Sequence, residues 1–330
     1  MAAAPDIVLL GNLLVDDIVR RDGSTLMGEP GGALLHAALA SRLWGARVGL
    51  VSVVGTDYPA AALEALADRG VDLAGVRPLG RPGGRAWLLE ERDVRRVIHQ
   101  LDCPGHDDVS PLPADVPAAF VGARGFHLAP MPLERQRSLA VALAVGGHSR
   151  PRPFSSGSIA GDAGVFLDRR PLLSLDPFEL VRDDNLAAWS QTLAHVDAFF
   201  PSRDEIRVGG SADDLVARLS GGRLCLVALK AGAAGGRLVD LAAGTSHTWI
   251  GRADRVVDAT GAGDAFVGGF LAGALLHGDL PRAVEQGIVS ASFAIEDWGA
   301  RGLFAATPDG AAARHAEWFG VAAAVGSAAP

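Results

Sequence analysis

The stretch DATGAGDAFVGGF, from Asp258 to Phe270, contains the residue types of this chain that are best suited to chemistry. Residues 256–258 end a predicted strand, and a helical apolar pattern begins at about Ala262. Glycines adopt the positive φ angles of a tight turn and let a ligand approach the backbone. Because the N–H groups of a first helical turn attract anions, this turn could hold a phosphate. Asp264 could then take a proton from a hydroxyl that attacks the phosphoryl group.

The residues of this turn alone leave two interpretations open. In the first, the turn binds a phosphate. In the second, it only starts a helix, and Asp264 is a first-turn carboxylate that the helix dipole favours. Two other phosphate-binding turns are excluded, because Gly-Lys-Ser/Thr is missing and because Gly261-Ala262-Gly263 is followed by Asp-Ala-Phe instead of completing GxGxxG.

The elements that must position this turn alternate between strands and helices. The first third of the chain reads as a strand at 6–10, a helix that stops at Gly45, a strand at 47–55 and a helix closed by Gly70. This alternation predicts an α/β fold with a doubly wound, mostly parallel sheet flanked by helices.

A few segments depart from this alternation. Residues 75–103 mix strand formers with charges, so parts of 12–30 and 75–103 are expected to form a small antiparallel β lid. Residues 146–171 are rich in Gly, Ser, Pro and Arg, which predicts a surface loop or a disordered insertion. Residues 321–330 are expected to be a frayed tail of a single α/β domain that spans 1–330.

The composition narrows the possible classes of function. A net charge of −8 over 330 residues argues against a basic surface for nucleic acids. The two cysteines, Cys103 and Cys225, belong to no CxxC or Cys/His cluster, so no disulfide framework or zinc site is expected. No apolar stretch approaches the ~18 residues that a membrane span needs, and no basic region precedes the first apolar run. We therefore expect a cytoplasmic protein without nucleic-acid or membrane partners.

A nicotinamide-dependent oxidoreductase would share the alternating pattern of strands and helices. It would require a GxGxxG turn after the first strand, where it binds the pyrophosphate of the cofactor. The sequence there is Gly11-Asn12-Leu13-Leu14, which disfavours this class.

Three segments together resemble the ribokinase/PfkB carbohydrate kinase family. The Asp258–Phe270 stretch resembles the C-terminal signature of that family, D-T-x-G-A-G-D-x-F. Residues 31–57, GGALLHAALASRLWGARVGLVSVVGTD, are similar to its N-terminal signature, and 226–236, LVALKAGAAGG, to its nucleotide-side strand and glycine turn. The resemblance implies a ribokinase-like fold and ATP-dependent phosphorylation of a hydroxyl on a small sugar, an inositol-like polyol or a nucleoside. It also implies Mg²⁺ and a monovalent cation as a possible further cofactor. The lid sheet would have an edge to cover, so a homodimer through the lid is a further expectation.

The resemblance also assigns roles to individual residues. Asp264 would be the catalytic base, with an anion hole formed by Gly261, Ala262 and Gly263. Glu205 would act on Mg²⁺ through water. The acceptor would be bound by Asp16, Gly31, Gly32 and His36. ATP would be bound by Lys230, the only lysine of the chain, and by Gly232, Gly235 and Ser292.

Two positions depart from the pattern of the family. His36 stands where many sugar kinases have an asparagine, which puts a ribose- or fructose-type acceptor in question. Ser202 stands for the asparagine of the P-N-x-x-E stretch, where it would weaken the organisation of the metal. These departures permit an alternative, namely a catalytically weak relative that binds a metabolite as a sensor or partner protein.

The remaining polar residues near the lid are expected to be solvated. Asp17 is expected to face solvent beside Asp16. A basic cluster is expected on the solvated face of the lid hairpin, from where one member could reach over the site; its members are Arg85, Arg92, Arg95 and Arg96.

Overall fold

The structure is a computed structural model that describes residues 3–91, 94–144, 170–210, 212–219 and 221–320. The predicted insertion at 146–171, apart from its last two residues, and the predicted tail at 321–330 lie outside the described residues.

Among the described residues, the large sheet has nine strands, and most of them are parallel. Their order is β15 (Thr245–Trp249), β14 (Gly236–Asp240), β13 (Leu226–Lys230), β11 (Ala198–Phe199), β9 (Leu172–Leu175), β8 (Gly125–Leu128), β1 (Ile7–Leu10), β4 (Val48–Val54) and β5 (Val71–Pro78). Only the β13–β14 and β14–β15 pairs are antiparallel. The carboxyl ends of the parallel strands therefore share one edge of the sheet, which is where ligands bind in such folds.

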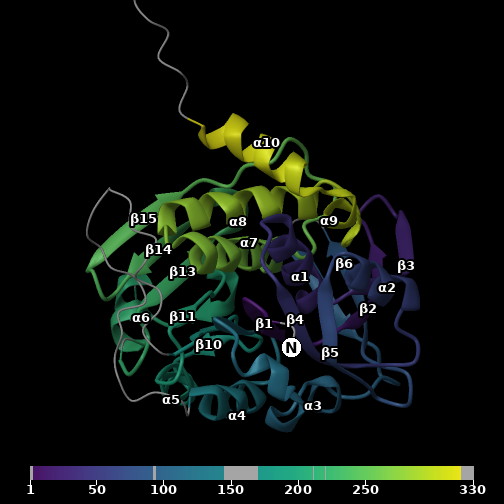
Figure 1. Ribbon diagram of the computed structural model, residues 1–330, viewed down its shortest axis with the longest axis horizontal. Helices are drawn as coiled ribbons and strands as arrows, with labels where there is room; N and C mark the ends of the chain where they lie inside the picture. The colour runs from purple at the N-terminus through teal and green to yellow at the C-terminus, as the bar shows by residue number, and fades with distance from the viewer. Residues whose placement is uncertain (1–2, 92–93, 145–169, 211, 220, 321–330) are drawn as a thin grey trace, which may run out of the picture.

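Helices cover both faces of this sheet, because the strand side chains are apolar on both sides. Ile7 and Leu9 of β1 belong to one buried apolar cluster, whereas Val8 and Leu10 belong to another. The first cluster packs against α1 (Ala33–Leu43), α2 (Ala60–Asp68), α7 (Ala262–His277), α8 (Leu280–Ile295) and α10 (Pro308–Phe319). The second packs against α4 (Leu133–Ala144), α5 (Leu186–Leu193) and α6 (Ala212–Leu219), on the opposite face in Figure 1. The predicted fold class is confirmed.

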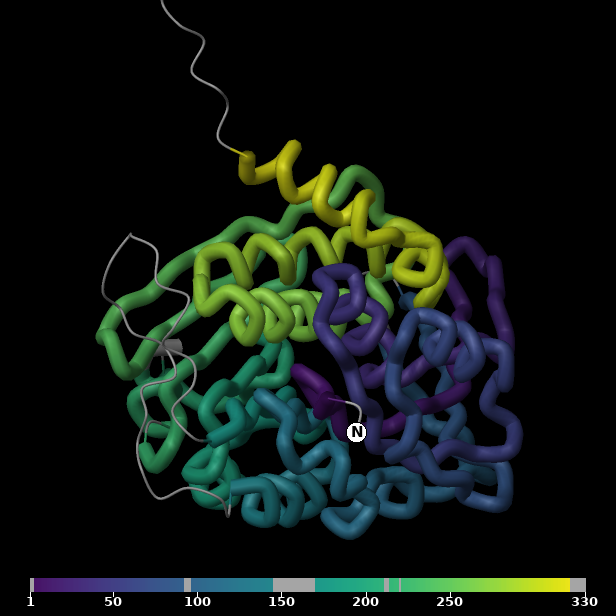
Figure 2. The backbone as a smooth tube through the Cα atoms, in the orientation of Figure 1, coloured from purple at the N-terminus to yellow at the C-terminus, as the bar shows by residue number. Residues whose placement is uncertain are grey.

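The first strand, β1, lies inside the sheet between β8 and β4, and the last described helix, α10, lies on the outside of the molecule. Figure 2 shows the N-terminal strand β1 inside the molecule and α10 as the outermost helix over α8. Short elements complete the fold: α3 (His106–Val109), α9 (Arg301–Ala305), the single-turn helices η1 (Pro113–Asp115), η2 (Ala118–Phe120), η3 (Arg203–Glu205) and η4 (Gly232–Ala234), and the pair β10 (Val181–Arg182) and β12 (Ile206–Arg207).

Close packing of α1 on α7 explains one glycine that follows the Asp258 turn. A Cβ atom on Gly268 would overlap the backbone of Ala37. The Ser41 hydroxyl donates to the Gly268 carbonyl over 2.9 Å. The two helices therefore approach each other backbone to backbone, which fixes the first turn of α7 against the N-terminal half of the chain.

A second, small sheet projects beside the large one and corresponds to the predicted lid. Its order is β3 (Thr25–Gly31), β2 (Leu14–Val19), β6 (Arg85–Glu91) and β7 (Val94–His99). The β2–β3 and β6–β7 pairs are antiparallel, whereas β2 and β6 at the centre run parallel. Its apolar side consists of Ile18, Ala86 and Leu88, which pack against Trp298 from the loop after α8.

The expectation that Asp17 faces solvent is wrong. Its side chain is 1% exposed and lies inside the small sheet. Arg85 donates to both carboxylate oxygens over 2.7 Å, and Gln100 and the Gly28 N–H donate over 2.9 and 2.8 Å. The hydrogen bonds from Arg85 are the main reason why the pKa of Asp17 lies below its usual value. A carboxylate in the middle of a strand requires such a partner, and Arg85 lies on the neighbouring strand.

The basic cluster of the lid is therefore divided. Arg85 is committed to Asp17, while Arg96 lies exposed and pairs with Glu91 at 3.0 Å. The side chains of Arg92 and Arg95 lie outside the described residues.

Two further features concern partners. No helix among the described residues is long and apolar enough to span a bilayer. The edge strand β7 exposes Val97 (53%) and Ile98 (46%), an apolar edge of the kind that a second chain could cover. The homodimer stays a prediction.

Candidate active site

Polar side chains gather at the carboxyl edge of the large sheet, on its β9–β11–β13 side. Asp176 follows β9, Ser202 follows β11, and Lys230 ends β13. Ser202 and Lys230 form a parallel bridge, and the Lys230 N–H donates to the Pro201 carbonyl over 2.9 Å. The first turn of α7 lies directly beside them, since a Cβ atom on Gly263 would be 3.3 Å from the Lys230 ammonium. The structure thus brings the glycine turn, Lys230 and the 201–205 segment together.

Lys230 is buried and paired with Asp176. Its Nζ lies 2.5 Å from Asp176 Oδ2, and the two residues are 8% and 2% exposed. Burial alone would lower the pKa of Lys230, but the carboxylates of Asp176, Glu205 and Asp264 raise it above its ordinary value. Lys230 therefore remains a cation at neutral pH. Burial raises the pKa of Asp176 to about 6, against the opposing effect of Lys230.

Glu205 lies on the single turn η3, next to this pair. Its Oε2 accepts a hydrogen bond from the Ser202 N–H over 2.6 Å. Burial, followed by the charge of Asp176, raises the pKa of Glu205 to about 7. Ser202 thus helps to orient Glu205 through its backbone N–H, and its side chain forms a further hydrogen bond with Glu205. The serine that replaces the usual asparagine leaves this hydrogen bond intact.

The turn before α7 is anchored from both sides. Gly261 is the N-cap of α7 with a φ of 70°, in the left-handed region that glycine favours. Asp258 Oδ1 accepts from the N–H and the hydroxyl of Thr260 over 3.0 and 2.6 Å, and Asp258 Oδ2 accepts from the Gly299 N–H over 2.9 Å. Asp264 lies in the first helical turn. The N–H groups of residues 261–263 thus belong to a rigid turn at the amino end of a long helix.

The predicted acceptor residues lie next to this turn. The buried His36 ring lies so close to Gly261 that a Cβ atom there would overlap it, and His36 Nδ1 donates to the Gly32 carbonyl over 3.2 Å. A Cβ atom on Gly31 would overlap the carboxylate of the buried Asp16. The N-terminal and C-terminal motifs therefore meet at His36 and Gly261.

The remaining predicted ATP residues lie in two places. Gly232 and Gly235 form the turn after Lys230 with φ angles of 55° and 86°, and Gly235 leaves no room for a side chain against Trp249. Ser292 is buried in α8; its hydroxyl donates to the Val289 carbonyl and accepts from Arg314, each over 2.7 Å. Its side chain is therefore already engaged inside the protein, and a contact between Ser292 and ATP stays a prediction.

Sequence reasoning missed Asp176. The available signal was the Asp-Pro pair at the end of the apolar, strand-like stretch LLSLDP. It also missed Tyr58, whose buried hydroxyl has no hydrogen-bond partner among the described residues. Burial, and then the charge of Asp16, raises the pKa of Tyr58. This phenol therefore keeps its proton beside the predicted acceptor carboxylate.

A polar chain joins the large sheet to the small one. Asn12, just after β1, donates from Nδ2 to His106 Nδ1 over 3.4 Å, and His106 Nε2 lies 3.0 Å from His99 Nε2 on β7. Burial, and then His99, lowers the pKa of His106 to about 4. The Phe178 ring, which is 39% exposed, lies 4.5 Å from the His106 ring, centroid to centroid. The partly exposed Phe178 ring thus lies beside the histidine that links the end of the large sheet to the small sheet.

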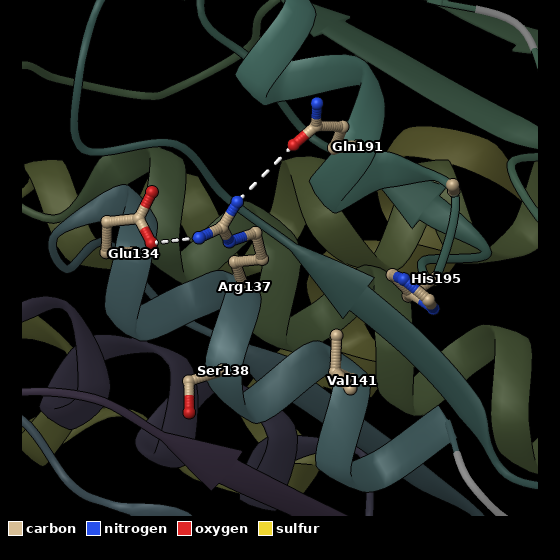
Figure 3. A pocket seen from close by; sticks show the side chains of 7 residues that line it. Glu134, Arg137, Ser138, Val141, Gln191 and His195 are labelled. Carbon is tan, nitrogen blue, oxygen red and sulfur yellow. Dashed lines mark hydrogen bonds and ion pairs between the residues drawn. The ribbon is translucent and has the colours of Figure 1, made fainter.

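A groove between α4 and α5 is separate from these residues. It measures about 670 Å³, and Figure 3 shows Arg137 bridging Glu134 and Gln191 along it. No predicted site residue lines it; its walls are Glu134, Arg137, Ser138, Val141, Gln191, Ala194 and His195.

Comparisons with known proteins agree with this geometry. Residues 175–306 match the family model of the pfkB family carbohydrate kinases. The chain is 28% identical over 302 residues to a cytidine kinase of Thermococcus kodakarensis, covering 89% of this chain and 97% of that protein.

Solved structures share the fold. A ribokinase II from E. coli, described as putative and in complex with ATP and Mg²⁺, aligns with a TM-score of 0.69 at 18% identity, covering 94% of this chain and 98% of that one. A nucleoside kinase of Burkholderia thailandensis in complex with inosine aligns with a TM-score of 0.68 at 18% identity, covering 95% and 98%. Residues 175–306 are thus similar to the pfkB family of carbohydrate kinases, most of the chain is similar to a cytidine kinase, and the fold is that of the ribokinase-like kinases; these similarities indicate a phosphotransferase with an alcohol group as acceptor.

Proposed function

We propose that this protein transfers the γ-phosphoryl group of ATP to a hydroxyl of a small sugar, polyol or nucleoside, with Asp264 as the base. The observation that carries the proposal is the placement of the Lys230 ammonium beside Gly263, in the same helical turn as Asp264. Phosphoryl transfer needs groups that stabilise negative charge and a group that accepts a proton. A buried cation and the N–H groups of a helix start can supply the first, and the carboxylate beside them can supply the second.

The proposed step requires one proton acceptor and several groups that stabilise negative charge. Asp264 would take the proton from the acceptor hydroxyl while its oxygen attacks the γ-phosphorus and ADP leaves in line. The N–H groups of residues 261–263 would receive the equatorial oxygens of the phosphoryl group. Asp16 and His36 would hold neighbouring hydroxyls of the acceptor. The small sheet would act as a lid that excludes water.

The carboxylates of the site fit Mg²⁺ bound together with ATP. Among the described residues, no three His, Cys, Asp or Glu side chains are grouped closely enough to hold a metal ion. Mg²⁺ is commonly held by one or two carboxylates, waters and substrate phosphates, so such a group is not required. Glu205, whose charge acts on the neighbouring Lys230, supplies a hard carboxylate oxygen that can receive metal-bound water. When bound, the ion would neutralise charge on the phosphates.

We favour a nucleoside among the possible acceptors. The exposed ring of Phe178 beside His106 offers a flat surface on which a nucleobase could stack. The similarity to a cytidine kinase over most of the chain supports this choice.

The test measures ADP formation with MgATP against a panel of nucleosides, sugars and inositols, in K⁺ and in Na⁺ buffers. We expect ADP formation that depends on the acceptor, with a nucleoside giving the highest kcat/KM, and a phosphorylated product with equal stoichiometry. If no member of the panel is phosphorylated while several raise the melting temperature, the protein is a metabolite sensor and the proposal is wrong.

A further inference from the structure

The ion pair between Asp176 and Lys230 is the most deeply buried charge pair near the proposed phosphoryl site. Asp176 lies outside the three segments that resemble the family signatures. It follows β9, whereas Lys230 ends β13, and β11 lies between these two strands in the sheet. The side chains therefore reach across the end of β11 to meet at 2.5 Å.

This pair determines where the ammonium group of Lys230 lies. Lysine carries a compact charge on a flexible stem, so its position depends on its partners. Asp176, Glu205 and Asp264 all act on Lys230, in that order of strength. Asp176 forms a direct hydrogen bond to Nζ over 2.5 Å. The bond holds Nζ where a Cβ atom on Gly263 would be 3.3 Å away.

The hydrogen bonding of Asp176 is not that of a carboxylate that only stabilises the fold. Its Oδ1 is buried and has no hydrogen-bond partner among the described residues. Such groups are rare in folded proteins, because an unsatisfied buried acceptor is destabilising. Asp197 provides a contrast in the same sheet: it is equally buried, but Arg223 and Arg170 bind its two oxygens at 2.7 and 3.0 Å.

We propose that Asp176 is a positioning residue for phosphoryl transfer, which holds the Lys230 ammonium beside Gly263 so that this cation meets the transferring phosphoryl group. The inference rests on the proposed function. Asp176 itself touches neither ATP nor the acceptor in this account; it acts through Lys230. Removal of its charge should therefore impair the transfer step more than the binding of either substrate.

The first test is Asp176→Asn, which keeps the shape of the side chain and removes its charge. We expect kcat to fall at least tenfold, while the acceptor KM and the dissociation constant of MgADP, measured by titration without turnover, change less than threefold. The loss of a negative charge near the phosphates opposes any weakening of nucleotide binding. An unchanged kcat would overturn the proposal.

A double-mutant cycle with Lys230→Met separates positioning from other roles. If Asp176 acts only through Lys230, Asp176→Asn should change kcat less than twofold in the Lys230→Met background, because the group it positions is gone. An effect of Asp176→Asn that persists in that background would show that Asp176 acts in another way.

Asp197→Asn is the matched control, since it neutralises an equally buried, ion-paired aspartate at the opposite end of the sheet. We expect it to lower the melting temperature and leave kcat of the folded protein unchanged. If kcat fell equally in Asp176→Asn and Asp197→Asn, Asp176 would contribute only to the stability of the fold and not to the transfer step. If Asp176→Asn does not fold, Asp176→Glu replaces it, because that variant keeps the charge and moves the carboxylate; kcat equal to wild type would then refute the positioning role.

The outcomes of the two proposals are distinguishable. If the wild-type protein phosphorylates no acceptor, the proposed function fails before any variant is compared. If it does and the variants behave like wild type, only the role of Asp176 fails.

Discussion

Gly261 is the residue at which the acceptor side and the phosphate side of the proposed site meet. Its φ of 70° places it in the left-handed region, and its missing side chain makes room for the His36 ring. His36 in turn is bound to the Gly32 carbonyl at the start of α1. A single backbone position therefore sets the distance between the first turn of α7, which contains the proposed base, and the residues that would hold the acceptor.

Gly261→Ala should abolish most of the activity. The added Cβ would overlap His36, so the turn, the ring or both must move, and a displacement of about 1 Å can lower the rate of a chemical step ~100-fold. We expect kcat to fall by about that factor. The measurement is acceptor-dependent ADP formation at saturating substrates.

Gly244→Ala is the control for the backbone strain itself. Gly244 has a φ of 67°, and no atom lies within 4 Å of a Cβ placed there. An alanine in the left-handed region destabilises by roughly 1–2 kcal/mol, so both variants should lose stability and only Gly261→Ala should lose kcat. Equal kcat values for the two variants would contradict the role of Gly261.

At the level of elements, the small sheet and the turn before α7, the proposed anion hole, share one support, residues 298–301. Trp298 completes the apolar side of the small sheet, and Arg20 lies over its ring at 5.1 Å. Arg301 donates to Glu29 of β3 over 3.0 and 2.8 Å. Between them, the Gly299 N–H donates to Asp258, which holds the turn before α7. A movement of the small sheet is therefore connected to the turn before α7 through residues 298–301.

Trp298→Ala should loosen this connection. We expect a higher acceptor KM and more ATP hydrolysis relative to transfer, because a lid that packs poorly admits water. Trp298→Phe should restore both values towards wild type, since it keeps a ring against Ile18. Normal transfer and normal hydrolysis in Trp298→Ala would contradict the connection.

The Arg301–Glu29 ion pair is partly exposed and worth about 0.2–1 kcal/mol. Arg301→Ala should therefore change the free energy of unfolding by no more than that.

At the level of the whole molecule, the core contains a buried histidine that makes stability depend on pH. His127 of β8 donates or accepts at Nδ1 with the Ser174 hydroxyl of β9 over 3.0 Å. Burial, and then the charge of Lys230, lowers the pKa of His127 to about 3. The folded state thus keeps this ring neutral, whereas the unfolded chain binds a proton below about 6.5. The contribution of the neutral His127 ring to the free energy of unfolding is therefore complete above pH 6.5 and is lost as the pH falls towards 3.

Between pH 7 and pH 5, the free energy of unfolding should lose about 2 kcal/mol through His127. Urea unfolding of the wild type and of His127→Gln at both pH values measures this contribution. His127→Gln should be less stable than the wild type at pH 7. Its free energy of unfolding should fall less between pH 7 and pH 5, and the difference from the wild type should be about that amount. An identical pH dependence in both proteins would show that His127 does not carry it.

Local sequence patterns predicted the parts of this molecule that depend on local chemistry. The β/α alternation predicted the sheet and its flanking helices, and the glycine turn at Asp258 predicted a helix start at Ala262, where α7 begins. Such patterns could not predict which charged residues pair when the two partners are distant in the chain. Asp17 is 68 residues from Arg85, and Lys230 is 54 residues from Asp176. Each pairing depends on which strands become neighbours, and a charged side chain alone does not reveal that.

The claim that Asp264 is the base of a phosphoryl transfer is tested most directly by kcat of Asp264→Asn with the best acceptor. Asp309→Asn is the matched control, because Asp309 is also a first-turn carboxylate, at the start of α10. We expect Asp264→Asn to lower kcat by about 10²–10⁴-fold while the fold and MgADP binding persist, and Asp309→Asn to leave kcat unchanged. If Asp264→Asn retained kcat within a few-fold of wild type, Asp264 would be a helix-start carboxylate and the proposed mechanism would be wrong.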